Sequence, residues 1–551
     1  MNDLFLPDSE TLEEADRLEA EAAAKLFPKK QAVKEPAKSA GSAKTEEKTR
    51  CEAEPAPNLY SMISEPCEFF TTPDQEPHVT IIYKKHPETV PTRSRKFRRH
   101  ITRTCYEKIG RPPTGRELKE TLDLCEAVAL FDGPIRQVYT RIAFHDEAIY
   151  IDLANEQYEL VKITKKGFEI VPSKLSPVPF IRTPRMAPMS RPEPGGSLLQ
   201  LRDFINAEDD NDWILIVAWL VGAMHPNGPF PILLLQGEQG SAKSTIARLL
   251  IDLIDPSTIP LCTSPRSERD LFISASKTRL LSFDNLSGIS DQLSDAFCRM
   301  ATGGGLATRS LFTDDSEKLF NSKRPVIING IADLLTRHDF TDRSIVINTA
   351  PIPQNKRKPE KEIWGPWQKV KPLVFGALCT AVSTALRTLD SIQLDSYPRM
   401  ADFARWVVAA ESSLPWEGGS FMKAYLENRA SIIELGLEAD PVGSSIMTLM
   451  GKREEWTGPA TDLLADLNKV APDHFRRLRG WPKQPNALSN KLRRSATFLR
   501  EKNYEIEWGK SGNRFIAIRR VGDDTTPDAE EAAESPASET QDLTLECEEV
   551  V

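Results

Sequence analysis

Metal-binding patterns are scarce in this sequence. Its 551 residues include eight cysteines and seven histidines. The cysteines are scattered without a C-x-x-C pair, and the histidines form no H-E-x-x-H cluster. Structural zinc sites and zinc hydrolases need such spacings, and secreted disulfide scaffolds need dense cysteine. These classes are therefore excluded, and we expect reduced thiols without a metal.

Long apolar runs are also missing. None approaches the roughly 18 consecutive apolar residues of a membrane-spanning helix. The acidic first residues, MNDLFLPDSETLEEADRLEAEAAAKLF, contain no apolar signal segment. Hydrophobic residues still make up 40% of the chain, which is enough to fold, and the length predicts two to four domains. We expect a cytoplasmic protein without a membrane partner.

The net charge of −9 is unevenly distributed. Residues 521–551 carry eleven acids and no base, and residues 1–57 carry thirteen acids and nine bases. Subtracting these ends leaves +6 for residues 58–520. Local charge matters more than the total for binding a polyanion, so a nucleic-acid partner remains possible. Both ends are poor in large apolar groups and are predicted to be disordered tails.

Four segments are predicted between the tails: a mixed α+β region at 58–190, an α/β core at 191–352, a helical region at 353–452 and a basic domain at 453–520. Alternating strands are expected in VTIIYKK and EAIYIDLANEQYELVKITKKGFEIV. An amphipathic helix capped by Thr114 is expected in TGRELKETLDLCEAVALF. A proline-rich stretch at 177–196 marks a linker.

Four short apolar runs between 231 and 348 predict buried parallel strands: PILLLQ, RLLSF, PVIIN and SIVIN. Helical patterns separate at least the earlier runs, which is typical of an α/β sheet. Ligands bind such sheets at the carboxyl ends of the strands. Each run indeed ends in polar residues, so we expect a site at that edge.

The first strand leads into GEQGSAKST, which is close to the phosphate-binding pattern G-x-x-x-x-G-K-[ST]. Its glycines permit a tight loop, Lys243 can reach the phosphates, and Ser244 can hold Mg²⁺. Ala242 replaces the second glycine, which is tolerable if φ there is negative. The alternative is a glycine-rich turn without a ligand. The predicted phosphate-binding residues are Gly237, Glu238, Gln239, Gly240, Ser241, Ala242, Lys243, Ser244 and Thr245.

Polar residues flank the other three strands. Asp284 ends the second strand, where a Mg²⁺–water ligand is required. Asn329 ends the third and is placed to orient an attacking water. Arg343 precedes the fourth and can stabilise charge on a neighbouring subunit's nucleotide.

Residues 231–350 resemble the AAA+ core of superfamily 3 helicases, most closely the phage- and poxvirus-type primase-helicases and bacterial mobile-element replication ATPases. GEQGSAKST is similar to their Walker A motif, LLSFDN to Walker B, RPVIINGI to the sensor strand and DRSIVI to the strand with the arginine finger. ATGGGLATRSLFTDDSEKLF resembles their DNA-facing hairpin.

This resemblance implies ATP and Mg²⁺ as cofactors and a homo-oligomeric ring such as a hexamer. It implies Mg²⁺ ligands at Ser244 and Asp284, and a second finger candidate at Arg337. The implied catalytic residues are Lys243, Asp284, Asn285, Asn329 and Arg343.

Two departures from the family pattern bear on activity. Walker B usually continues with an acidic general base, but Asn285 stands there and an amide cannot take a proton from water. Hydrolysis is then slow, or Asp291 or Asp295 serves instead. The hairpin also lacks the lysine that the family often carries there. DNA contact at the hairpin would fall to Arg309, Lys318, Lys323 and Arg324.

The basic C-terminal segment predicts a winged-helix domain. EWTGPATDLLADLNKV is expected to form a first helix, NALSNKLRRSATFLREK a second helix capped by Asn486, and YEIEWGKSGNRFIAIRR a hairpin. The predicted DNA contacts are Lys491, Arg493, Arg494, Lys510 and Arg514. The alternative is a solvated basic face. A second basic run, RSRKFRRHITR at 93–103, either contacts phosphates or is a helix with Phe97 in its core.

The leading interpretation is an α/β protein with a P-loop AAA+ core, acting as an ATP-dependent DNA helicase or translocase in phage, plasmid or mobile-element replication. The N-terminal region would dock replication proteins. The second interpretation is an ATP-binding DNA switch, an initiator or regulator with weak hydrolysis, which Asn285 favours. A remodeller of proteins is the third and would make the basic body and the winged helix coincidental.

Overall fold

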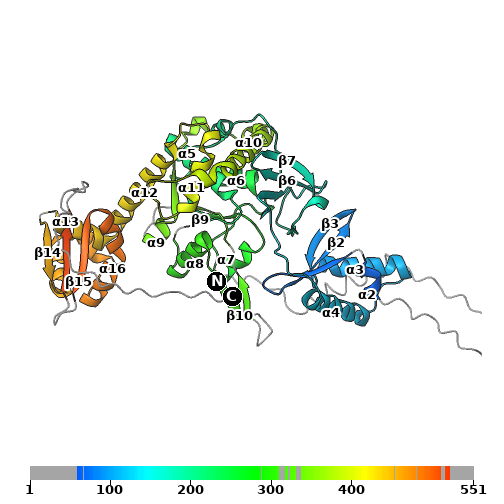
Figure 1. The fold of residues 1–551 in the computed structure, drawn as a ribbon. Helices are drawn as coiled ribbons and strands as arrows, with labels where there is room; N and C mark the ends of the chain where they lie inside the picture. Colours follow the sequence, from blue (N-terminus) through cyan, green and yellow to red (C-terminus); the bar gives the residue numbers. More distant parts are fainter. Residues whose placement is uncertain are drawn as a thin grey trace, which may run out of the picture. The chain divides into compact units, whose positions relative to one another are not determined.

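The computed structural model describes residues 59–65, 67–286, 288–309, 317–320, 323–330, 337–451, 453–478, 481–509 and 515–521 (Figure 1). Both predicted tails, apart from Val521, lie outside these residues. So do the wing candidates Lys510 and Arg514.

The first described segment packs two long helices on a three-stranded antiparallel sheet of order β1-β2-β3. Its elements are α2 (Leu59–Ser64), β1 (Glu68–Thr71), β2 (Pro77–Tyr83), β3 (His86–Pro91), α3 (Arg95–Ile109) and α4 (Gly115–Phe131). The predicted cap of α4 is confirmed: Thr114 Oγ1 accepts from the Glu117 N–H at 3.2 Å, and the Glu117 carboxylate accepts from the Thr114 N–H at 2.7 Å. Phe97 of α3 is fully buried, as one of the two interpretations of the basic run expects.

A second antiparallel sheet has the order β4-β5-β6-β7. Its strands are β4 (Ile142–His145), β5 (Ala148–Asp152), β6 (Glu159–Thr164) and β7 (Gly167–Pro172), followed by η1 (Ser173–Leu175). Residues of this sheet share one hydrophobic core with the helices around the central sheet, whereas β1–β3, α3 and α4 have a core of their own. The fully buried Arg141 donates to Asp255 Oδ1 at 2.8 Å and so joins this sheet to the end of α6. One hydrophobic core therefore includes residues on both sides of the predicted boundary at 190.

The central sheet consists of four parallel strands, as predicted, in the order β13-β8-β12-β9. They are β8 (Ile232–Gly237), β9 (Leu281–Leu286), β12 (Val326–Gly330) and β13 (Ser344–Thr349). The other elements of this region are η2 (Leu198–Phe204), α5 (Asp210–Ala223), α6 (Lys243–Ile254), α7 (Glu268–Ala275), α8 (Asp291–Thr302), β10 (Leu306–Arg309), β11 (Glu317–Phe320) and α9 (His338–Thr341).

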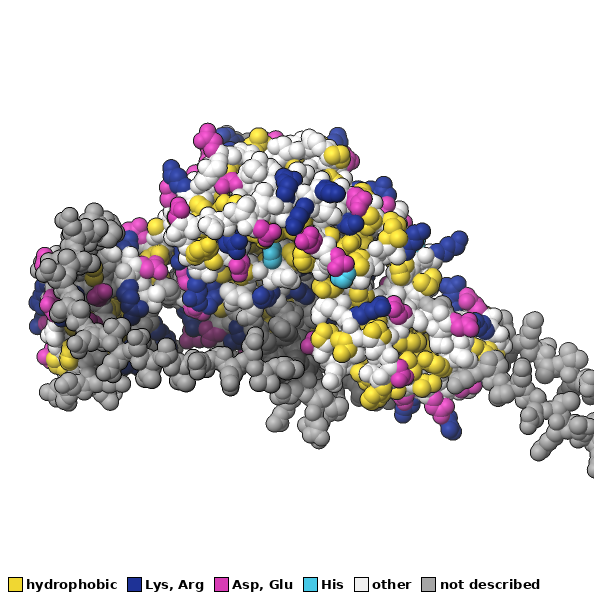
Figure 2. Space-filling model, viewed as in Figure 1, with side chains coloured by type: hydrophobic (Ala, Val, Ile, Leu, Met, Phe, Trp, Pro, Cys, Tyr) yellow, Lys and Arg dark blue, Asp and Glu magenta, His cyan; other side chains and the backbone are white. Residues whose placement is uncertain are grey.

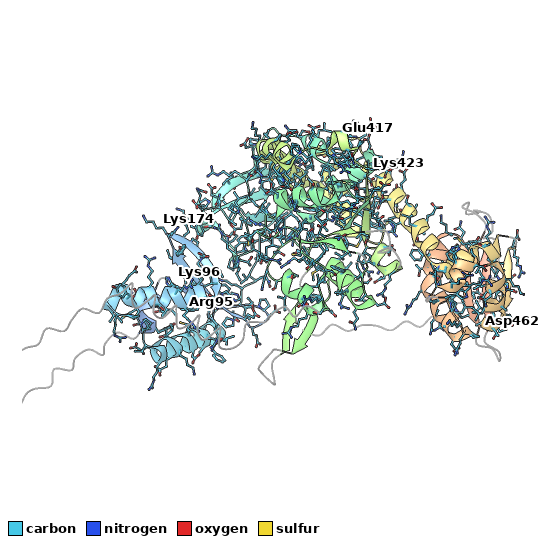
Figure 3. All side chains as sticks on the ribbon, turned by 180° about the vertical axis from the view of Figure 1, so that it is seen from behind. Arg95, Lys96, Lys174, Glu417, Lys423 and Asp462 are labelled. Carbon is cyan, nitrogen blue, oxygen red and sulfur yellow. The ribbon has the colours of Figure 1, made fainter. Side chains whose placement is uncertain are left out.

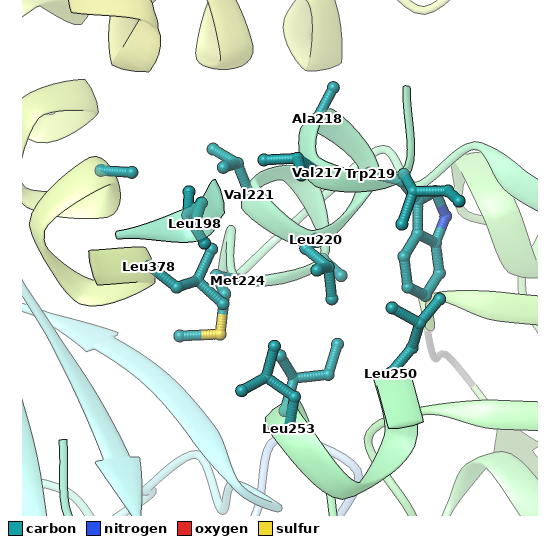
Figure 4. Packing of buried hydrophobic residues seen from close by; sticks show 14 of the residues in the cluster. Leu198, Val217, Ala218, Trp219, Leu220, Val221, Met224, Leu250, Leu253 and Leu378 are labelled. Carbon is teal, nitrogen blue, oxygen red and sulfur yellow. The ribbon is translucent and has the colours of Figure 1, made fainter. Parts of the chain in front are cut away.

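Helix α5 is buried on nearly every side, which explains its almost wholly apolar sequence. Trp219 of this helix lies beside Leu250 of α6 (Figure 4) and donates its indole N–H to the Pro231 carbonyl at 2.7 Å. Burial of one such large side chain contributes about 1.5–3 kcal/mol. This packing holds β8 and α6, the two elements that flank the predicted phosphate-binding loop.

Helix α10 (Glu360–Thr388) bears on the expected absence of a membrane-spanning helix. An 18-residue window within Glu360–Ser391 has a mean hydropathy of 1.4. By length and composition alone, this helix could span a membrane. Here it is a core helix: it packs against β6, β7, α5 and α11, and Lys371 Nζ bonds Asp252 at 2.9 Å. Its neighbours are η4 (Gln354–Lys356), η5 (Leu389–Ser391), α11 (Ala401–Ala410), η6 (Glu411–Ser413) and α12 (Ser420–Ala439).

The C-terminal segment is built from α13 (Pro441–Met450), β14 (Glu455–Gly458), α14 (Ala460–Val470), α15 (Asp473–Arg477), α16 (Pro485–Glu501), β15 (Tyr504–Gly509) and β16 (Phe515–Arg520). Its sheet has the antiparallel order β14-β16-β15. Two details were predicted wrongly. Glu455–Gly458 pairs with β16 instead of opening a helix, and α16 begins with Pro485 at its first turn after Gln484, so Asn486 is not the cap. Residues of α13 also belong to this core.

Candidate nucleotide site

The loop between β8 and α6 encloses the ammonium group of Lys243. Its Nζ donates to the carbonyls of Gly237 at 2.8 Å and Glu238 at 2.7 Å. Partial burial lowers the pKa of Lys243, and the nearby Asp284 carboxylate opposes that shift. The carbonyls therefore hold the cation over the loop, where a phosphate would replace them as partner.

Gly237 is required by the packing at the start of this loop. Its φ is +143°, and a Cβ there would lie 2.3 Å from Thr349 Oγ1. Thr349, at the end of β13, bonds Ser241 Oγ at 2.6 Å and the Gln236 carbonyl at 2.7 Å. Thr349, at the end of β13, is therefore hydrogen-bonded to residues before and within the loop.

Ala242 departs from its expectation. We expected a negative φ, but Ala242 has φ +67° and ψ +20°, in the left-handed region. A residue with a Cβ is disfavoured there by roughly 1–2 kcal/mol. Ala242 therefore occupies a backbone conformation that glycine would adopt without this steric cost.

Three side chains meet at the carboxyl edge of the sheet. Ser244 Oγ donates to Asp284 Oδ1 at 2.9 Å, and Asn329 Nδ2 donates to Ser244 Oγ at 3.0 Å and to Asp284 Oδ1. They come from α6, β9 and β12, respectively. A hydroxyl and one carboxylate are donors that fit Mg²⁺, which commonly takes few protein ligands and completes its shell with phosphates and water.

Asn285 has φ +57° and is exposed. The pairing of β12 with β9 shifts register between Ile328 and Gly330, so Asp284 and Asn285 lie at a β-bulge. Bulges re-aim side chains beside active sites, and asparagine is enriched at positive φ. Asn285 therefore suits the backbone that presents Asp284.

Asp291 and Asp295, the alternative candidates for the general base, are both paired with Arg337, the second candidate for the arginine finger. Arg337 Nη2 lies 2.8 Å from Asp295 Oδ1, and Nη1 lies 3.7 Å from Asp291 Oδ1. Both aspartates are therefore held by Arg337 in this arrangement, which leaves neither carboxylate without a cationic partner.

Arg343 lies at the opposite edge of the sheet. Its carbonyl accepts from the Ile232 N–H at 2.9 Å, and its side chain is 12% exposed and paired with Asp339. Since a strand advances about 3.3 Å per residue, Ile232 and Gly237 are separated by roughly 17 Å. Arg343 is thus remote from the loop between β8 and α6 of its own chain.

Arg357 was missed by the sequence analysis. A Cβ on Gly240 would lie 2.8 Å from Arg357 Nη2, so this guanidinium rests against the loop between β8 and α6. Arg357 follows η4 in the segment NKRKPEK. That basic run is a signal, but no motif assigns one of its cations to the loop.

The hairpin candidates for DNA contact have different surroundings. Arg324 donates to the carbonyls of Ala275 and Thr278 at 3.0 and 3.1 Å, and burial lowers its pKa to about 10. Its guanidinium is therefore occupied by the fold. Lys323 is half-buried beside Gly303. The backbones of Arg309 and Lys318 lie on opposite strands of the β10–β11 hairpin.

The C-terminal candidates lie on α16. Lys491, Arg493 and Arg494 line a cavity of about 550 Å³, which Arg399 and Arg429 also line. Figure 2 shows basic and acidic side chains interspersed over the described surface on that side of the molecule. Positive charge is therefore not gathered on that face, and DNA contacts must be argued residue by residue.

Two family models match the sequence. The model described as actinomycete integrative conjugative element replication protein matches residues 196–431, and that of the AICE RepA C-terminal domain matches residues 442–535. Together they span more than half of the chain. No curated protein matches.

Among solved structures, the SCCmec type IV Cch active helicase is similar at 11% identity, over 82% of this chain and 92% of that one, with a TM-score of 0.45. The apo NrS-1 C-terminal region is similar at 12% identity, over 84% and 98%, with a TM-score of 0.36.

Proposed function

Because the chain belongs to the family of actinomycete integrative conjugative element replication proteins, we propose that it is an ATP-dependent DNA helicase or translocase of the superfamily 3 type. It would act in the cytoplasm, in replication of the mobile element. The observation that carries this proposal is the convergence of Ser244, Asp284 and Asn329 beside Lys243 at one edge of the parallel sheet. Phosphoryl transfer needs such a set of charged and polar groups.

Each residue has a distinct task in this proposal. Lys243 exchanges its carbonyl partners for the β- and γ-phosphates. Ser244 and Asp284 would hold Mg²⁺, which neutralises charge on those phosphates. Asn329 orients the attacking water. Since the transition state is largely dissociative, positioning and charge matter more than proton abstraction. Asn285 then slows hydrolysis without preventing it.

Two arginines would complete the site from different chains. Arg357 rests on the phosphate loop of its own chain, so it would contact the same nucleotide. Arg343 lies at the far edge of the sheet and would serve a neighbour's nucleotide. This arrangement requires a homo-oligomer. In a closed ring such as a hexamer, every nucleotide site receives Arg343 from the neighbouring subunit.

The C-terminal segment would contact DNA as a winged helix. Its order of α13, β14, α14, α16 and the β15–β16 hairpin supports this assignment. Arg493 and Arg494 are exposed on α16 and are the described candidates for backbone contacts.

A nucleotide-gated DNA-binding switch is the second candidate. It is favoured by Asn285 and by the pairing of Asp291 and Asp295 with Arg337, which together leave the site without a free base of the usual kind. Such a protein would bind ATP and DNA but turn over little ATP.

An assay of forked DNA duplex unwinding by the full chain, with ATP and Mg²⁺, distinguishes the helicase proposal from the switch proposal. The helicase proposal predicts strand separation that Lys243→Ala abolishes. Normal ATP binding without unwinding or DNA-stimulated turnover would contradict it and favour the switch.

A further inference from the structure

A basic cleft of about 1240 Å³ lies away from the nucleotide site. Helix α3, the β2–β3 hairpin, residues 181–185 and α7 line it, and Thr183 Oγ1 donates to the Lys277 carbonyl at 2.7 Å. Eight lysines and arginines line the cleft against a single acid, Glu107. None of the described residues of the candidate nucleotide site lines this cleft. This imbalance differs from the interspersed charges on the face shown in Figure 2 and fits a polyanion.

The sequence of α3 produces one wall of the cleft. Ser94 caps the helix by accepting from the Phe97 N–H at 3.2 Å, and Phe97 and Ile101 are fully buried. Residues four apart lie on one helical face, so Arg95 and Arg99 form a row that faces the cleft. Arg95 is labelled on α3 in Figure 3.

Some of these cations serve the fold, and others are available. Arg182 is paired with Asp152 and lies over the Tyr158 ring at 4.1 Å. Within the described part of the chain, Arg95, Arg99 and Lys277 form no ion pair. Like charges four residues apart on a helix repel each other weakly, and a phosphate bound between Arg95 and Arg99 would remove that repulsion. These three are therefore the phosphate contacts to expect.

The floor of the cleft adds an aromatic and apolar surface. Tyr83 is half-buried there, with Lys96 Nζ 4.8 Å from its ring centre, and Ile82 is 49% exposed. Aromatic rings interleaved with cations bind unstacked bases and their phosphates. The bases of a duplex are stacked on one another inside the helix, so they are not available to stack on Tyr83.

We propose that this cleft binds single-stranded DNA, with Arg95, Arg99 and Lys277 on phosphates and Tyr83 beneath a base. The inference rests on the proposed function in taking DNA as the substrate class. It adds a strand-holding site outside the ATPase core and the α16 surface.

Fluorescence anisotropy of the full chain with an oligo(dT) strand tests the cleft across a salt series. Arg95→Ala/Arg99→Ala should weaken binding at least tenfold at low salt and reduce the salt slope by about 1.4, since each phosphate contact on a single strand contributes about 0.7. Tyr83→Ala should weaken binding roughly 5- to 150-fold without changing the slope, because stacking contributes about 1–3 kcal/mol per base.

The matched control is Arg98→Ala, an exposed arginine of the same helix that does not line the cleft. It should bind oligo(dT) like the wild type. If Arg95→Ala/Arg99→Ala behaves like this control, or if a blunt duplex loses as much affinity as the single strand, the cleft proposal is wrong. ATP hydrolysis without DNA, measured in the same variants, should be unchanged. If the wild type does not hydrolyse ATP but the variants lose oligo(dT) affinity as predicted, the helicase proposal is contradicted and the cleft proposal is supported.

Discussion

Replacing Ala242 by glycine tests the backbone conformation of the proposed phosphate-binding loop. At φ +67° the alanine is disfavoured by roughly 1–2 kcal/mol, and glycine loses about 0.5–1 kcal/mol more backbone entropy on folding. The difference between these two energies predicts that Ala242→Gly stabilises the core around β8 and α6 by about 0.5–1 kcal/mol. For a unit of 150–250 residues, that raises Tm by roughly 1–4 °C.

Thermal unfolding followed by tryptophan fluorescence measures this shift, because Trp219 lies in the core beside α6. The matched control is Ala377→Gly, at a half-buried position inside α10 that has no positive φ. There glycine should destabilise by about 0.5–1 kcal/mol. ATP affinity should stay unchanged in Ala242→Gly, since no side-chain contact is lost. Equal destabilisation by both substitutions would refute the left-handed assignment.

Three further predictions address the nucleotide site and its support. Arg343→Ala should lower kcat at least 10³-fold while ATP still binds, and mixing it with Lys243→Ala should restore part of the ATPase rate; no recovery would contradict action between chains. Arg357→Ala should weaken ATP binding about tenfold by titration calorimetry, and the exposed neighbour Lys358→Ala should not. Burial, then Arg279 and Lys323, lowers the pKa of His225 to about 4, so unfolding free energy should fall by up to about 3 kcal/mol as pH drops from 6.5 to 4. A His225→Gln protein should lose less over that window.

The sheet and its polar edge were predictable from local sequence. Buried parallel strands appear as unbroken apolar runs, and the carboxyl ends of parallel strands share one edge. Ser244, Asp284 and Asn329 could therefore be grouped from their positions after three runs. The cap at Thr114 followed from a capping-box spacing.

The remaining features depend on contacts distant in sequence. The position of Arg357 over Gly240 depends on the path of the chain after β13, which no periodicity encodes. The left-handed φ of Ala242 is set by its surroundings against its own preference. The β4–β7 sheet joins the central core through Arg141 and Asp255, which are 114 residues apart. Propensity also gave no sign that Glu455–Gly458 would pair as a strand, because that pairing is made with β16.

Steady-state ATP hydrolysis, measured with and without single-stranded DNA, tests the central claim most directly. The wild type should hydrolyse Mg²⁺–ATP faster when DNA is added. Lys243→Ala should lose that activity, because no other described cation is held by the loop carbonyls where the phosphates would bind. A wild type that binds ATP without DNA-stimulated turnover, or a Lys243→Ala protein with an unchanged rate, would contradict the account.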